Sequence, residues 1–446
     1  MRAPASPFEN PSYFDAIKKD LISTNSGNLI FVHSIARALM KDGVDVDFDK
    51  ANKLWDEEDI KRINSEYDAF IIPLANAFRS SFKQQMVIMT ENVKKLNIPC
   101  VIVGVGYQGD IEGAFDGDPA LDKVVKGFVK AVLSKSGKIG LRGEVTAGYL
   151  EHLGFKAEKD FTVIGCPSMY LYGSALPKPK QVDISPEMRI NLNCKAFLDQ
   201  DTHDYFHYVC EQIPDHVYIV QNLYELKTIF CGMNVKLASP TRLKKHNNYP
   251  YDYSHRLYRE NKMRGFVSAQ AWLDYLKTRD LNFGTRIHGN ICGVLSGLPT
   301  FIVASDARVL ELAEYHNIQH IKNPELKGKD IFELLSGADF ESVNKGHGER
   351  FLHYLAFMHE NGFETIFDSA GTRSVFDEKI SGIDFRGPLV TMPFADYETQ
   401  YQAVLYWEHL YKKERRQKKV SPYEEKIEQL KQNPFLYKMI KKKLND

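Results

Sequence analysis

The sequence predicts an α/β protein made of two Rossmann-like domains that face each other across a cleft, followed by a helical C-terminal extension. A chain of 446 residues is too long for one ordinary core, so two domains are expected. Short apolar runs alternate with helical patterns, which favours parallel sheets. A polar stretch with three prolines, residues 174–187, divides this alternation into two halves. We place the domains at 1–178 and 185–340, and the extension at 341–446.

The first half begins with a Pro-rich arm, residues 1–14, and a loop of capping residues, 23–28. Helical periodicity follows over residues 29–40. Three apolar runs are typical of strands, at residues 44–48, 69–73 and 100–105. The last run leads into residues 104–109, which match G-x-G-x-x-G. Because no helix opens directly after these glycines, we interpret them as a tight strand-end loop and not as a nicotinamide-dinucleotide site.

The second half shows strand patterns at residues 189–193 and 216–221 and a helix pattern at 266–276. The stretch 280–314 then predicts a strand, a turn, a helix of small residues and a second strand. The turn carries Arg286 and His288 directly before the helix. In open α/β sheets, ligands bind at the carboxyl ends of strands, where helix N-termini offer N–H groups to anions.

An Arg and a His at such a turn indicate a site for an anionic ligand with one acid–base group. Arg supplies a planar fork for carboxylate or phosphate, and His gains or loses a proton near neutral pH. Since the two residues are two apart in an extended segment, their side chains are expected on the same side. The alternative is a surface Arg and a His whose ring is satisfied by the backbone.

Three motifs, in a fixed order along the chain, carry a family resemblance. Residues 138–146, KIGLRGEVT, surround Arg142, and residues 163–168 combine a strand with Cys-Pro. The third motif runs from Thr285 through Gly-Leu-Pro at 297–299 to Arg308, where the family usually has Lys. Together these motifs resemble the polysaccharide pyruvyl transferase family over roughly residues 21–320.

The resemblance implies a GT-B-like arrangement and the transfer of pyruvate from phosphoenolpyruvate to a sugar of a surface polysaccharide precursor, as a cyclic ketal. The expected catalytic residues are Arg286 and His288, with His288 as general acid or base. Donor binding is expected from Arg142, Arg286, Gly289, Asn290 and Arg308. For the acceptor we select residues expected near the same cleft: Asn25, Asn28, Asn76, Arg79 and Tyr107. The implied scheme needs no metal and no cofactor, since phosphoenolpyruvate is a substrate.

Two other functions stay open at this point. A GT-B glycosyltransferase that uses a nucleotide-sugar would need an acid on the ribose, and Asp306 or Glu311 is available for it. A non-catalytic glycan-binding protein would keep the fold and lose the chemistry. Asn28 favours that reading, because the family has Asp at the corresponding position.

The bulk composition excludes several other classes. A net charge of zero gives no sign of a nucleic-acid partner. The six cysteines form no C-x-x-C pair, which indicates reduced thiols in a cytoplasmic protein. The N-terminus lacks the apolar core of a signal peptide, and no apolar stretch is long enough to span a bilayer. His203 and His207 share a helix face but lack the further ligands that zinc needs, so no metal site is predicted.

The C-terminal tail differs from the rest of the chain in charge. From Tyr411 on there are 12 Lys/Arg and 5 Asp/Glu, which leaves 46 and 53 in the remainder. Residues 421–446 predict a basic amphipathic helix whose apolar face includes Phe435 and Met439. We expect it to allow peripheral contact with the inner membrane face, where a lipid-linked saccharide acceptor would lie. The alternative is a helix packed on the body with a solvated lysine face.

Overall fold

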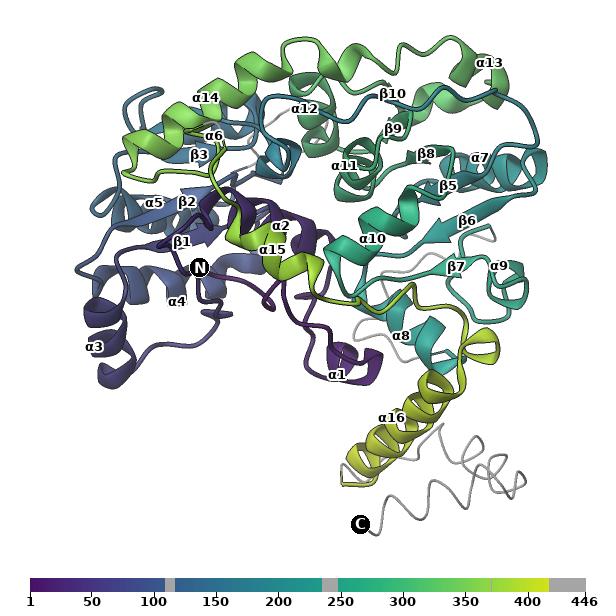
Figure 1. Ribbon diagram of the computed structural model, residues 1–446, viewed down its shortest axis with the longest axis horizontal. Helices are drawn as coiled ribbons and strands as arrows, with labels where there is room; N and C mark the ends of the chain where they lie inside the picture. Colours follow the sequence, from purple (N-terminus) through teal and green to yellow (C-terminus); the bar gives the residue numbers. More distant parts are fainter. Residues whose placement is uncertain (109–116, 235–247, 370, 417–446) are drawn as a thin grey trace.

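The computed structural model describes residues 1–108, 117–234, 248–369 and 371–416, and it contains two α/β units with parallel sheets (Figure 1). Helices follow the strands and return the chain to the next parallel strand. The predicted fold class, two Rossmann-like units facing each other in a GT-B-like arrangement, is confirmed. Residues 174–187, predicted as the linker, contain neither helix nor strand and connect the two units.

The first unit is built on four short parallel strands. They are β1 (Phe70–Pro73), β2 (Cys100–Val103), β3 (Ile139–Leu141) and β4 (Phe161–Val163). β1 pairs with β2 and β3 with β4, while a parallel bridge from Val105 to Leu141 links the two pairs. Its helices are α3 (Glu57–Glu66), α4 (Lys83–Lys94), α5 (Pro119–Leu133) and α6 (Glu144–His152). β1, β2 and β3 are buried along their whole length, as expected for a sheet covered on both faces.

The second unit contains one six-stranded parallel sheet in the order β10-β9-β8-β5-β6-β7. Its strands are β5 (Ile190–Asn193), β6 (His216–Ile219), β7 (Met263–Arg264), β8 (Leu281–Gly284), β9 (Thr300–Ala304) and β10 (His320–Lys322). Its helices are α7 (Gln200–Gln212), α8 (Leu223–Cys231), α9 (Arg256–Arg259), α10 (Ala269–Leu276), α11 (Ile287–Leu295), α12 (Ala307–Tyr315) and α13 (Ile331–Ser336). β5, β8 and β9 lie side by side at the centre, so the residues that follow them meet at one edge of the sheet.

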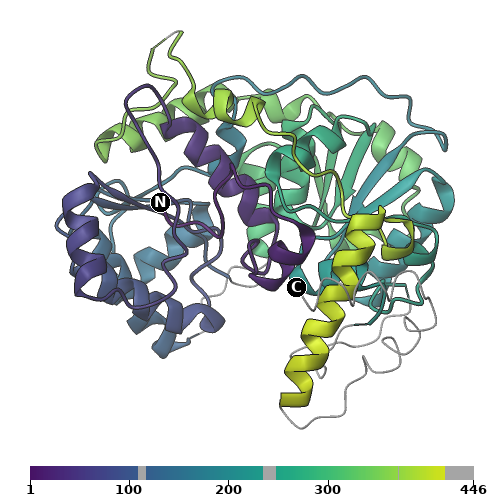
Figure 2. The same cartoon turned by 60° about the horizontal axis from the view of Figure 1, so that its bottom comes forward.

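Both ends of the chain cross between the units, as Figures 1 and 2 show. The helices of these two end segments are α1 (Tyr13–Lys18), α2 (Gly27–Leu39), α14 (His347–Glu360), α15 (Val375–Ser381) and α16 (Tyr397–Arg416). α1 packs with the core of the second sheet through Ala16 and Ile17, although we predicted residues 1–178 as the first domain. α14 returns to the first unit, where Phe357 lies against Gly140. The domain limits otherwise stay a prediction.

Three local expectations need comment. Residues 44–48 are not a strand; Val46 and Phe48 pack beside Phe376 of α15 and do not join a sheet. The predicted N-terminal arm is fixed on the body, because the backbone of Arg2 forms a parallel β-bridge with Asp49 and Ala3 is buried. The predicted amphipathic helix at 421–446 lies outside the described residues. Over the part of the chain that is described, no helix is long and apolar enough to cross a bilayer.

Candidate active site

The turn after β8 is fixed by bonds to the end of β5. Thr285 N donates to Asn193 O at 2.8 Å, and Arg286 N donates to the Asn193 side-chain oxygen at 2.9 Å. α11 begins directly after Arg286 without a side-chain cap. Its first turn, which includes Gly289, therefore offers N–H groups of the kind that bind anions.

Buried asparagines hold β5, β8 and α11 together. The Asn290 amide nitrogen donates to Gly284 O at 2.9 Å, and its oxygen accepts from Asn193 at 3.1 Å and from Asn282 at 2.8 Å. Asn290 is fully buried and uses its amide within this framework. The predicted donor contact of Asn290 is therefore wrong, and we assign the residue to the support of the turn.

His288 lies in the first turn of α11 and faces the start of α2. Its ring contacts Phe31 edge-on at 5.8 Å, and a Cβ added to Gly27 would lie 2.6 Å from Nδ1, so only glycine fits there. Its Nε2 atom is buried and has no hydrogen-bond partner among the described residues. Burial, together with Arg142 and Arg308, lowers the pKa of His288 to about 3. The ring is therefore neutral near neutral pH.

Arg142, directly after β3, brings a buried positive charge from the first unit to His288. Its side chain is almost fully buried, with 1% of the residue exposed. The Nε and Nη2 atoms have no hydrogen-bond partner within the described part of the chain. Burial lowers the pKa of Arg142, and Arg308 acts in the same direction. The two residues that we predicted on facing sides of one cleft are thus brought together.

Arg308 and Arg79 complete this group. Arg308 Nη2 donates to Asp306 at 2.8 Å. The Asn76 side-chain amide is oriented so that its oxygen faces both guanidinium groups. That oxygen accepts from Arg308 Nη1 at 2.6 Å and from Arg79 Nη1 at 3.2 Å. The Nε atoms of both arginines are buried without a partner among the described residues. We call Arg79, Arg142, His288 and Arg308 the cationic cluster. Buried N–H groups without acceptors favour an anionic ligand at this place.

Arg286 lies in a different environment. Its Nη2 atom is 3.5 Å from Glu225 Oε2, and its Nε donates to Cys194 O at 3.1 Å. Burial raises the pKa of Glu225, while Arg286 opposes that shift. Arg286 is the extended N-cap of α11 and His288 lies in the first turn of that helix, so the extended segment from which we expected a common side-chain direction ends between them. The donor contact of Arg286 stays a prediction.

Two acidic residues of α12 are engaged within the protein. Asp306, its N-cap, pairs with Lys195 and Arg308. Burial alone would raise the pKa of Asp306, but these two cations hold it well below its ordinary value. Glu311 accepts from Val145 N of the first unit at 3.1 Å. Burial raises the pKa of Glu311 to about 7, although Arg142 and that N–H oppose the shift.

Lys195 was not predicted from the sequence. It follows β5, donates from its backbone to Thr285 Oγ1 at 2.9 Å, and donates from Nζ to Ser305 Oγ at 2.8 Å. Burial, with Arg308 and Arg286, lowers the pKa of Lys195 to about 8, although Asp306 raises it. A local signal for it was present, since Cys194 and Lys195 come directly after a buried strand that ends at Asn193.

The predicted acceptor residues divide into two groups. Arg79 belongs to the cationic cluster and Asn76 accepts from two of its arginines, while Asn25 accepts from Gly27 N at 2.8 Å beside His288. The Asn28 amide instead donates to Ile22 O and Ser23 O, at 3.1 and 3.2 Å, and so holds the loop. Tyr107 is buried and stacks on Tyr149 at 4.1 Å. Both side chains thus make contacts within the chain, and their acceptor contacts stay predictions.

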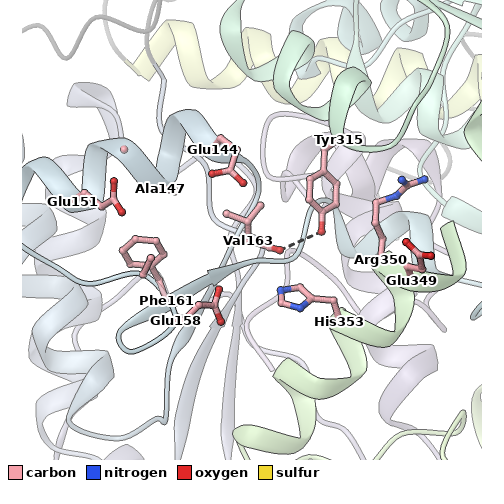
Figure 3. A pocket seen from close by; sticks show the side chains of 12 residues that line it. Glu144, Ala147, Glu151, Glu158, Phe161, Val163, Tyr315, Glu349, Arg350 and His353 are labelled. Atoms are coloured by element: carbon pink, nitrogen blue, oxygen red, sulfur yellow. Dashed lines mark hydrogen bonds between the residues drawn. The ribbon is translucent and has the colours of Figure 1, made fainter. Parts of the chain in front are cut away.

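A surface pocket of about 520 Å³ lies apart from these residues, between α6, β4 and α14 (Figure 3). Glu144, Glu151, Glu158 and Glu349 surround it, and Tyr315 donates to Val163 O at 3.1 Å across it. It contains none of the predicted site residues. No cluster of metal-binding side chains is found in the described ranges.

Comparison with known proteins gives one strong match and several weak ones. The model of the family described as polysaccharide pyruvyl transferase matches residues 25–307. No curated protein matches the chain at a significant level.

The similar solved structures are remote. A putative UDP-N-acetylglucosamine 2-epimerase from Listeria monocytogenes is 12% identical, with a TM-score of 0.39 over 68% of this chain and 77% of that one. The Methanocaldococcus jannaschii UDP-GlcNAc 2-epimerase, in complex with UDP-GlcNAc and UDP, is 13% identical, with a TM-score of 0.36 over 67% and 79%. HepE from Anabaena, in complex with UDP and glucose, is 13% identical, with a TM-score of 0.34 over 73% and 80%. Similarities this low assign no ligand to the present chain.

The family match covers more than half of the chain and includes nearly all of the candidate site. It begins at Asn25, beside His288, and ends at Ala307, next to Arg308. Arg142 and the turn after β8 both lie within it. The chain belongs to the polysaccharide pyruvyl transferase family.

Proposed function

We propose that this transferase moves pyruvate from phosphoenolpyruvate onto a sugar of a surface polysaccharide precursor, forming a cyclic ketal. The observation that carries the proposal is the cationic cluster. Three arginines and a histidine meet between the two units, and each has a buried nitrogen without an acceptor in the described part of the chain. Phosphoenolpyruvate carries a phosphate and a carboxylate, so it supplies the acceptors that these groups lack.

The donor fits the cluster in one arrangement better than in others. Arg142 and Arg308 would hold the phosphate and carboxylate, with the first turn of α11 at Gly289 taking part of the phosphate charge. The Arg308, Asp306 and Lys195 side chains expose 19%, 21% and 22% of their area, whereas Arg142 is closed off. A ligand would therefore reach the cluster from the side of Arg308.

His288 would transfer protons in this scheme. Its neutral ring is suited to accept a proton from an attacking sugar hydroxyl and to pass it to the leaving phosphate. An anion bound beside the ring also stabilises the imidazolium that forms, because it offsets Arg142 and Arg308.

The acceptor side is proposed from fewer contacts. Arg79 belongs to the cluster, and Asn25 and Asn76 lie next to it. These residues present amide and guanidinium groups, which suit sugar hydroxyls. A lipid-linked saccharide at the inner membrane face, reached by a cytoplasmic enzyme through its basic tail, is the acceptor that this scheme uses. The acceptor sugar and the position of the ketal would be identified by screening in the assay described below.

The nucleotide-sugar alternative is disfavoured by one observation. It needs a free acid for the ribose, yet Asp306 is paired with Lys195 and Arg308 and Glu311 accepts from Val145 N. Both carboxylates would have to leave these partners first.

The test compares donors on one protein. Phosphoenolpyruvate should raise the melting temperature more than any nucleotide-sugar, and with a panel of galactosides it should release phosphate and yield a pyruvylated sugar in the mass spectrum. Arg142→Met should abolish the phosphoenolpyruvate shift. Arg279→Met is the matched control, because Arg279 is buried but paired with Asp215 at 2.9 Å. Stabilisation and turnover by a nucleotide-sugar alone would disprove the proposal, and binding without turnover would favour a non-catalytic glycan-binding protein.

A further inference from the structure

Lys195 is held by the same turn that positions His288. Its backbone N donates to Thr285 Oγ1 at 2.9 Å, and the preceding carbonyl, Cys194 O, accepts from Arg286 Nε at 3.1 Å. Its Nζ donates to Ser305 Oγ at 2.8 Å and pairs with Asp306. The ammonium group is therefore fixed where β5, β8 and β9 end.

The ammonium lies on the accessible edge of the cationic cluster. Lys195 and Asp306 expose 22% and 21% of their side chains, and Arg308 shares the Asp306 carboxylate at 2.8 Å. Through Arg308, which also acts on His288, the Lys195 ammonium and the imidazole belong to one continuous group of charges. The Lys195 side chain is therefore more accessible than His288, of which 9% is exposed.

The two groups differ in protonation. The pKa of Lys195, lowered by burial and by Arg308 and Arg286 but raised by Asp306, is about 8, whereas that of His288 is about 3. Near neutral pH the lysine carries a proton that it can release, and the imidazole carries none to spare. A pair of titratable groups whose environments push their pKa values apart is typical of the acid and the base of a reaction.

We propose that Lys195 is a catalytic residue, the general acid that protonates the methylene carbon of the donor, and that His288 is the complementary base. This inference rests on the proposed function. It places a proton donor directly after β5, where we predicted no catalytic group.

The step balances without any further reactant. A proton leaves Lys195 Nζ, and the electron pair of the donor's C=C bond forms the new C–H bond, so positive charge develops at the carbon that bears the phosphate. The first sugar hydroxyl adds to that carbon and returns its proton to the Lys195 amine. The second hydroxyl displaces phosphate, and its proton travels through His288 to the leaving phosphate. One donor and one diol give one ketal and one phosphate.

The test uses kcat across roughly pH 5 to 10 for the parent and for Lys195→Arg, which keeps the charge but cannot lose a proton in this range. We expect the parent to lose kcat as the pH rises above about 8, because the acid is then deprotonated. Lys195→Arg should lower kcat by about 10²–10⁴-fold and abolish that alkaline limb. Its affinity for phosphoenolpyruvate, from calorimetry, should stay within about threefold of the parent.

Lys180→Arg is the matched control, since Lys180 also has a lowered pKa but donates to Arg279 O away from the site. Its kcat and pH profile should be those of the parent. If Lys195→Arg keeps kcat and the alkaline limb, or loses donor affinity with kcat intact, Lys195 is not the acid. A parent that forms no pyruvylated sugar overturns the proposed function instead, so the two failures are distinct. Lys195→Gln, checked by melting temperature, should reproduce the loss of kcat.

Discussion

The two sides of the turn after β8 differ in how their positive charge is compensated. On one side, Arg286 lies against Glu225, which exposes only 2% of its side chain. On the other side, His288 faces Arg142 and Arg308, and buried nitrogens there have no acceptor among the described residues. Leaving a buried cation such as Arg142 unpaired costs free energy, whereas a buried ion pair needs no further ligand.

This difference separates the residues that hold the turn in place from the residues that we propose for the reaction. The Arg286 side holds the turn on β5 and α8, because Asn193 binds the turn and Glu225 places a negative charge beside the Arg286 guanidinium. The His288 side keeps buried nitrogens without acceptors among the described residues, and the proposed anionic donor would supply those acceptors. Each of the following predictions changes one side and leaves the other intact.

The largest effect is expected from His288→Gln. It should lower kcat by about 10²–10⁴-fold, because the variant cannot accept a proton, while donor affinity changes little. The acidic limb of the pH–rate profile should disappear, since that limb reports protonation of the base. His33→Gln is the control, because His33 is an equally buried histidine of α2 that packs on Phe376. If His288→Gln keeps kcat within about threefold, the ring has no role in proton transfer.

Arg286→Met is expected to act on stability. Removing one partner of a buried pair leaves Glu225 uncompensated, which costs about 3–5 kcal/mol of unfolding free energy. Urea denaturation measures this loss, and the Arg286→Met/Glu225→Gln double variant should recover much of it. Arg37→Met, which breaks a more exposed pair with Asp377, should cost less. Additive losses in the double variant would show that the two residues are not coupled.

Arg142→Met should produce the opposite pattern. We expect kcat/KM to fall by about 10²–10³-fold, the usual cost of deleting one preorganised donor. The free energy of unfolding without ligand should not fall, because the substitution removes a buried cation that lacks a partner. Calorimetric melting with and without phosphoenolpyruvate separates the two effects. A destabilised, fully active variant would mean that Arg142 belongs to the framework.

Local patterns pointed to the residues of the cationic cluster better than to the residues that support them. The ordered motifs pointed to Arg142, His288 and Arg308, since each directly follows a strand or opens a helix near its C-terminal end. Asn290 was misassigned because its partners Asn193 and Asn282 come from two strands whose pairing no local pattern fixes. Lys195 was missed for the same reason, as its low pKa depends on charges about a hundred residues away in sequence.

Local sequence patterns likewise could not predict how the two ends of the chain pack. The apolar face of α1 has no property that selects one unit over the other, and it packs with the second sheet through contacts from distant segments. The alternation of strands and helices, by contrast, depends on residues close in sequence, and it predicted the two parallel sheets.

The smallest predicted effect is a pH dependence of stability that comes from His288. Its pKa is about 6.5 in an unfolded chain and about 3 in the fold, so only the unfolded state gains a proton between these values. Stability is therefore full above about pH 6.5 and decreases as the pH falls, by about 2 kcal/mol from this residue at pH 5. Urea midpoints at pH 7 and pH 5 should differ more for the parent than for His288→Gln.

Phosphoenolpyruvate should reduce the acid sensitivity of the parent, because a bound anion raises the pKa of His288. The part that comes from His33, whose pKa burial lowers to about 4, should not respond to the ligand, since His33 lies beside Phe376 and away from the cationic cluster. An acid sensitivity that the ligand leaves unchanged would place the anion away from His288.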